Sequence, residues 1–156
     1  MKSVYRVLAY LIALEVVIQA AAVAFAIAGL GKWIMEGGVL DAAAMESEST
    51  GFTEEVGFMI HGINGQMIVP LIALLLLISS FFAKIPGGVL WAGLVLATVV
   101  VQTLLGIFGH GMPILGLVHG IVAFVLFTLA VIAARRPEAA LGHLERTAER
   151  GTAGVA

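Results

Sequence analysis

The chain has 156 residues, of which 61% are hydrophobic and 12% are charged. Its mean hydropathy of +1.10 is typical of a membrane protein and excludes an ordinary soluble domain. A net charge of −2 argues against a nucleic-acid partner. The chain has no cysteine, which excludes disulfides, thiolate metal sites and iron–sulfur clusters, so any redox role requires a bound cofactor.

Four apolar segments are each long enough to cross about 30 Å of hydrocarbon as a helix. The first follows Lys2 and Arg6, but its apolar run is too long for the hydrophobic region of a signal peptide, so we expect an uncleaved span. Short connections between the later segments force antiparallel neighbours, which predicts an all-α, up-down-up-down four-helix transmembrane bundle. The spans are predicted at 7–30, 57–83, 89–110 and 113–134, within a transmembrane domain that covers 1–136.

The basic residues predict the orientation of this bundle. Lys32 is the only basic residue on one side of the four-span topology, and the other seven of the eight lie on the opposite side. The positive-inside rule therefore predicts a multi-pass protein of the plasma membrane with both termini in the cytoplasm. The acidic loop 31–56 then lies outside, with room for a short amphipathic helix around Val39–Met45, and 137–156 form a cytoplasmic tail with a short helix that then frays. We see no convincing internal sequence repeat.

Three of the four histidines, His61, His110 and His119, lie at the outer end of the predicted spans. Placing an imidazole in hydrocarbon costs free energy, so three histidines at a similar depth indicate a shared role. The second and fourth spans run in the same direction, which places His61 and His119 across the bundle from each other. Two neutral imidazoles can bind a haem iron from its two faces, and small neighbours would make room for the macrocycle: Gly62, Gly65, Gly116 and Gly120.

Other interpretations of these residues are open. The two histidines could instead form hydrogen bonds between helices that pack through their glycines. His110 ends the third span, where it could contact a haem propionate, bind a metal or lie in the headgroup region. An outer copper or other metal site could use all three histidines together with nearby methionines, namely Met59, Met67 and Met112.

Three polar residues lie deeper in the predicted membrane region. Glu15 is near the middle of the first span, Gln19 follows one turn later on the same face, and Gln102 is on the third span. We expect the Glu15 carboxyl to be neutral and hydrogen-bonded, with Gln102 as a candidate partner. These residues are candidates for a proton relay, for a contact with a quinone headgroup, or for a purely structural bond between helices. Two further serines, Ser79 and Ser80, are expected to bond to carbonyls of their own helix.

The run Gln102-Thr103-Leu104-Leu105-Gly106, a short turn and then His119-Gly120 form one recognisable pattern, and His61-Gly62-Ile63-Asn64-Gly65 forms another. Together they resemble one four-helix half of the haem A synthase family over about 57–134; small actinobacterial membrane proteins also look similar. The resemblance implies that His61 and His119 are haem ligands. This chain departs from the family in having one bundle rather than two, Phe58 in place of a glutamate, and Gly62 in place of an arginine.

These observations predict a membrane protein that binds one b-type haem between His61 and His119. Without a soluble catalytic domain, an electron carrier or a subunit of a larger redox complex is favoured over a complete enzyme. Its expected partners are membrane lipid, a quinone, and other membrane subunits or further copies of the chain. The alternatives are a structural or accessory subunit without a cofactor, and an outer-face copper or metal protein.

Overall fold

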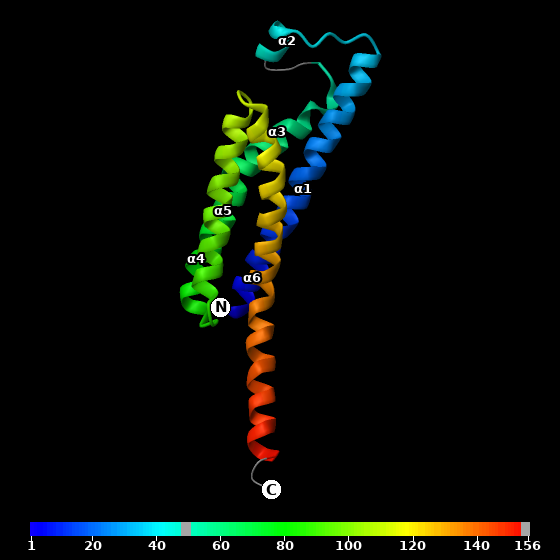
Figure 1. The fold of residues 1–156 in the computed structure, drawn as a ribbon. Helices are drawn as coiled ribbons and strands as arrows, with labels where there is room; N and C mark the ends of the chain where they lie inside the picture. The colour runs from blue at the N-terminus through cyan, green and yellow to red at the C-terminus, as the bar shows by residue number, and fades with distance from the viewer. Residues whose placement is uncertain (48–50, 154–156) are drawn as a thin grey trace.

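The computed structural model describes residues 1–47 and 51–153, with the side chains of residue 45 and of 137–153 left out. Within these residues every regular element is a helix, and four helices are long and apolar enough to cross a membrane. Figure 1 shows the four packed side by side, with consecutive helices in opposite directions. The predicted all-α, up-down-up-down bundle is therefore confirmed. The four are α1 (Lys2–Met35), the segment Thr53–Ala83, α5 (Gly88–Gly109) and the spanning part, Pro113–Arg136, of α6.

The second membrane helix is not uniform. It begins as a 3₁₀ turn, η1 (Thr53–Glu55), continues as α3 (Val56–Ile63), and then widens into a π-helical turn, η2 (Asn64–Ile68), before α4 (Val69–Ala83). In Figure 1, α3 runs obliquely across the bundle whereas α4 runs alongside α5. A single straight helix over 57–83 was expected, and the π turn, which redirects the chain immediately after His61, was not.

Two further segments refine the predictions outside the bundle. The expected short helix in the outer loop is present as α2 (Ala42–Glu46), and the Asp41 side chain caps it by accepting from the Ala44 N–H at 2.8 Å. The backbone of α6 runs without a break from Pro113 to Ala153. We expected a separate short helix after Pro137, but a proline removes only one backbone donor from the helix and here does not end it.

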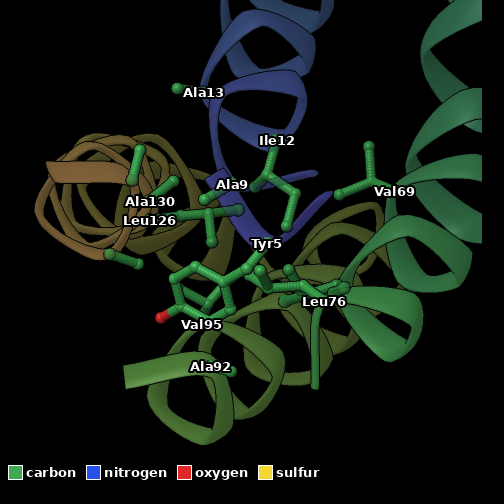
Figure 2. Close-up of a cluster of buried hydrophobic side chains, with 14 of the residues drawn as sticks. Tyr5, Ala9, Ile12, Ala13, Val69, Leu76, Ala92, Val95, Leu126 and Ala130 are labelled. Carbon is green, nitrogen blue, oxygen red and sulfur yellow. The ribbon is translucent and has the colours of Figure 1, made fainter. Parts of the chain in front are cut away.

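The helices of the bundle pack as a ring: α1 contacts α4 and α6, and α5 also contacts α4 and α6. Helices α4 and α6 are therefore diagonal, as are α1 and α5. Small side chains bring the backbones close together, which is how membrane helices gain packing contacts without a hydrophobic driving force. The buried cluster in Figure 2 is made in this way, with Tyr5, Ala9, Ile12, Leu76, Ala92, Val95, Leu126 and Ala130 among its members.

Specific bonds tie the helices together at the end of the bundle that holds the N-terminus. The buried Tyr5 hydroxyl donates to the Gly88 carbonyl oxygen at 3.2 Å, which joins α1 to the start of α5. The Arg136 guanidinium lies 4.8 Å from the centre of the Trp91 ring, which joins α6 to α5 through a cation–π contact. The two serines of α4 bond to their own helix as expected, Ser79 to the Leu76 carbonyl and Ser80 to the Leu77 carbonyl.

The opposite half of the bundle is packed less completely. None of the described side chains in 14–25 of α1, 58–68 of the second helix, 100–109 of α5 or 113–125 of α6 is fully buried. Full burial resumes at Ala26 and Gly57 on one side of this band and at Val69 and Leu126 on the other. The section of the bundle that contains His61 and His119 is therefore less buried than the sections on either side of it.

Candidate functional site

The structure brings together two of the three outer histidines. The rings of His61, on α3, and His119, on α6, have centroids 5.9 Å apart and planes inclined at 70°. Both residues are half-buried. The prediction that these imidazoles face each other is borne out by this geometry.

The His119 ring is held by the neighbouring helix. Its Nδ1 lies 3.0 Å from the backbone carbonyl oxygen of Gln102 on α5. A carbonyl oxygen can only accept, so this bond requires the ring proton on Nδ1 and leaves Nε2 with a free lone pair. A backbone carbonyl at one ring nitrogen is the usual way in which a metal-binding histidine is oriented, with the other nitrogen facing the metal.

The Gln102 side chain completes a reciprocal contact with His119. Its amide nitrogen donates to the His119 carbonyl oxygen at 3.0 Å. Helices α5 and α6 are thus joined by two hydrogen bonds that run in opposite directions between the same two residues. We call this arrangement, His Nδ1 to a Gln carbonyl and Gln amide to the His carbonyl, a Gln–His clamp.

A second Gln–His clamp holds His61. Its Nδ1 lies 3.3 Å from the carbonyl oxygen of Gln19 on α1. The orientation of the Gln19 amide is assigned from its hydrogen bonds: the nitrogen donates to the His61 carbonyl oxygen at 3.1 Å, and the oxygen accepts from the Gly65 N–H at 2.9 Å. In this orientation the amide nitrogen also lies directly against His61 Nδ1.

The extra bonds of Gln19 lie at the π turn that follows His61. Pro70 has no N–H to donate, and the Val69 N–H bonds to the Asn64 carbonyl, five residues back. The Gln19 amide bonds to two backbone groups beside this turn, the Gly65 N–H and the His61 carbonyl, and the His61 carbonyl also accepts from the Asn64 N–H. A side chain inserted into the helical hydrogen-bond ladder is a recognised cause of such irregular turns, which are common at functional sites.

Glu15 has a different partner from the one predicted. Its carboxyl oxygen accepts from the Asn64 side-chain amide in the π turn, not from Gln102. The reason is the packing order: α1 contacts α3, and α5, which carries Gln102, is diagonal to α1. The Gln102 side-chain oxygen is buried without a hydrogen-bond partner among the described residues. Asn64 was missed as a site residue, although an amide three residues after His61 in an apolar helix was a usable signal.

The glycines near the histidines have different surroundings. A methyl group built at Gly116 or Gly120 would meet nothing within 4 Å, and one at Gly62 would only touch the Gln66 amide at 4.0 Å. Gly116 and Gly120 are exposed, and the backbone of Gly116 lies close to Gly109 of α5, where an added methyl group would be 3.4 Å from the Gly116 nitrogen. A methyl group built at Gly65 would instead lie 3.6 Å from the Gln19 side-chain amide.

Gly106 was not assigned to the site from the sequence, yet it lies directly under the His119 ring. A methyl group at this position would be 3.2 Å from Cε1 and 3.4 Å from Nδ1 of His119. Its position one helical turn after Gln102 on the same face of α5 was the available signal.

His110 stays apart from this site. It is exposed, and its Nδ1 lies 3.3 Å from the Ile107 carbonyl oxygen of its own helix. Among the described residues no three His, Cys, Asp or Glu side chains come together in a way that could hold a metal ion. The three methionines considered for copper are exposed, Met59, Met67 and Met112. The three-histidine metal site considered above is therefore not assembled in the described part of the chain.

The two clamps reveal a short repeat that the sequence analysis did not find. The glutamines follow similar triplets, Val16-Val17-Ile18 before Gln19 and Val99-Val100-Val101 before Gln102, and both histidines begin the sequence His-Gly-Ile. Gln19 and His61 are 42 residues apart, whereas Gln102 and His119 are 17 residues apart. The first separation is larger because the outer loop lies between Gln19 and His61. This difference in spacing hides the repeat from an inspection of the sequence alone.

No family model matches the chain, and comparison with curated proteins and with solved structures finds no match to either.

Proposed function

We propose that this protein is a membrane-embedded b-type haem protein of electron transfer, in which His61 and His119 would hold the haem iron. One observation carries the proposal: two half-buried imidazoles from diagonal helices face each other at 5.9 Å, each with Nδ1 at a backbone carbonyl. Two imidazoles that share one metal through bonds of about 2.0–2.1 Å have ring centres about 6 Å apart. The separation therefore fits a single metal atom between them.

The surroundings of the pair are consistent with a macrocycle. The bundle lacks fully buried side chains in the band that holds the histidines, and an added methyl group at the exposed Gly116 or Gly120 would meet nothing within 4 Å. With no cysteine in the chain, the donor set consists of two neutral nitrogens, which suits haem iron. When bound, such a group supplies reversible one-electron chemistry, whose potential the protein sets through its axial ligands, hydrogen bonds and burial.

The role that suits this architecture is an electron carrier or a subunit of a larger redox complex in the plasma membrane, with both termini in the cytoplasm. The four apolar helices and the one-sided distribution of basic residues favour that placement. Glu15 and Asn64 offer a carboxyl and an amide within the membrane, beside the helix that carries His61. The Glu15 carboxyl is suited to exchange a proton with a quinone, the class of partner that we propose for electron exchange, and the Asn64 amide can hold the carboxyl by a hydrogen bond.

The test is an absorption spectrum of the purified protein after expression with ample haem. We expect a low-spin spectrum that changes on reduction, and we expect His61→Ala or His119→Ala to abolish or strongly alter it. His110→Ala should keep low-spin ligation, because His110 lies outside the pair. Protein without any tetrapyrrole would refute the proposal and favour a cofactor-free structural subunit, whereas an intact spectrum in both single variants would place the haem elsewhere.

A further inference from the structure

The two Gln–His clamps differ in what faces the Nδ1 atom of each histidine. At His119, within the described part of the chain, Nδ1 has one hydrogen-bonding partner, the Gln102 carbonyl oxygen at 3.0 Å. At His61 two groups of Gln19 compete for Nδ1: the carbonyl oxygen at 3.3 Å and the side-chain amide nitrogen, which lies closer. This difference sets the two histidines apart chemically.

The competing groups make opposite demands on the neutral imidazole ring. A carbonyl oxygen needs a proton on Nδ1, whereas an amide N–H needs a lone pair there. A neutral ring carries one proton, so a lone pair on Nδ1 means a proton on Nε2, and a protonated Nε2 cannot bind a metal. The bond to Gln102 thus prepares His119 as a ligand, and the amide of Gln19 does the reverse for His61.

The π turn holds the Gln19 amide in this orientation. Rotating the amide by 180° would place its oxygen against the His61 carbonyl and its nitrogen against the Gly65 N–H, and both of its backbone bonds would be lost. The clamp at His119 has no such constraint, because α6 is a regular helix beside His119 and the Gln102 oxygen has no partner among the described residues. The irregular turn and the chemical difference between the two rings therefore have one cause.

We propose that Gln19 is a positioning residue that controls the tautomer of His61, so that His119 is the permanent ligand and His61 is the ligand recruited on binding. This inference rests on the proposed haem function. Recruitment moves the ring proton of His61 from Nε2 to Nδ1, where it is donated to the Gln19 carbonyl, and the lone pair of Nε2 becomes available. The ring stays neutral throughout, and no proton is gained or lost overall.

The test uses the whole protein without haem, labelled with ¹⁵N in its histidines, because the nitrogen chemical shifts distinguish the two tautomers directly. In the unsubstituted protein we expect the proton on Nε2 in His61 and on Nδ1 in His119. Gln19→Glu keeps the shape of the side chain, and its neutral carboxyl can still donate to the His61 carbonyl and accept from the Gly65 N–H. Its hydroxyl oxygen then faces Nδ1 as an acceptor, so the His61 ratio should shift towards the Nδ1 proton at least about fivefold, the worth of about one hydrogen bond.

Gln102→Glu is the matched control, because the Gln102 amide bonds to the His119 carbonyl and not to its ring; neither tautomer should change. Gln19→Met removes the amide and leaves only the carbonyl at Nδ1, so it should also move the proton of His61 to Nδ1. If the carboxyl of Gln19→Glu ionises, both nitrogens of His61 become protonated and that variant no longer reports a tautomer. The Gln19→Met variant then gives the test of whether Gln19 controls the tautomer of His61.

The inference is overturned if His61 and His119 carry the same tautomer in the unsubstituted protein, or if His61 keeps its tautomer in Gln19→Met. Its failure is distinguishable from that of the proposed function. Expected tautomers in a protein that never takes up haem would remove the haem function and keep the role of Gln19. If haem binds between the two histidines but both carry the same tautomer in the haem-free protein, the haem function is kept and the role of Gln19 is lost.

Discussion

The Gly106→Ala substitution gives a sharp test of how His119 is held. The added methyl group would lie 3.2 Å from Cε1 and 3.4 Å from Nδ1 of His119, so the ring must move by a few tenths of an ångström. The movement is directed away from α5, which stretches the 3.0 Å bond from Nδ1 to the Gln102 carbonyl. Such a hydrogen bond contributes about 1 kcal/mol net, so weakening it removes a substantial part of the interaction energy that orients the His119 ring.

The effect of Gly106→Ala on folding should be smaller than its effect on the site. Alanine is favoured over glycine inside a helix by roughly 0.5–1 kcal/mol, and extra volume at a packed contact costs about 1–3 kcal/mol. These contributions oppose each other, so we expect a change in stability of no more than about 2 kcal/mol. The haem spectrum should change more clearly, with a reduced low-spin fraction and weaker retention of haem.

Gly93→Ala is the matched control, because Gly93 is on the same helix and a methyl group there would meet nothing within 4 Å. It should be neutral or slightly stabilising and leave the spectrum unchanged. The assay is the low-spin absorption spectrum with a thermal melt of both variants in detergent. If Gly106→Ala and Gly93→Ala gave the same spectrum in a protein that binds haem, the reasoning that α5 positions His119 as a ligand would be refuted.

Three further predictions follow from the structure. Glu15→Gln should fold normally, because its amide oxygen still accepts from Asn64, whereas Glu15→Leu should lower the thermal stability by about 1–3 kcal/mol through the unpaired amide; equal melting of the two would contradict the importance of this bond. Gly57→Ala should destabilise the fold by at least about 1–3 kcal/mol, because its methyl group would lie 2.3 Å from the Ala22 backbone oxygen and must push α1 and α3 apart; a melt unchanged from the parent protein would show that the two helices separate freely. Reporter fusions at residue 45 and at the C-terminus should report opposite sides of the membrane, and a signal from the same side would exclude the four-span topology.

Several features of this protein follow from local sequence. Hydropathy over windows of about twenty residues is sufficient to place the membrane helices, because each apolar segment satisfies its own backbone hydrogen bonds wherever its neighbours lie. The short loops then restrict consecutive helices to antiparallel packing. His61 and His119 could be paired from depth and direction alone, since the helices that carry them run the same way and their positions along those helices are similar.

The hydrogen bonds of the site could not be predicted in this way. Glu15 was matched with Gln102 because both are polar and deep, but the order of helices around the bundle places Asn64 beside Glu15 instead. The π turn is contacted by a residue that is distant in sequence, since the Gln19 amide of α1 bonds to the His61 carbonyl and the Gly65 N–H. Gly106 belongs to the site only because α5 and α6 cross closely there.

The sequence by itself therefore determined the number of spans, the bundle topology and the two facing histidines, all of which depend on the composition and length of continuous segments. Only the tertiary structure decided which nitrogen of each histidine is held, by which glutamine, and in which clamp the helix is irregular. The physical reason is that a polar group within the membrane must find its partner among whichever neighbours come within about 3 Å. That set of neighbours is decided by helix rotation and crossing, which no single segment encodes.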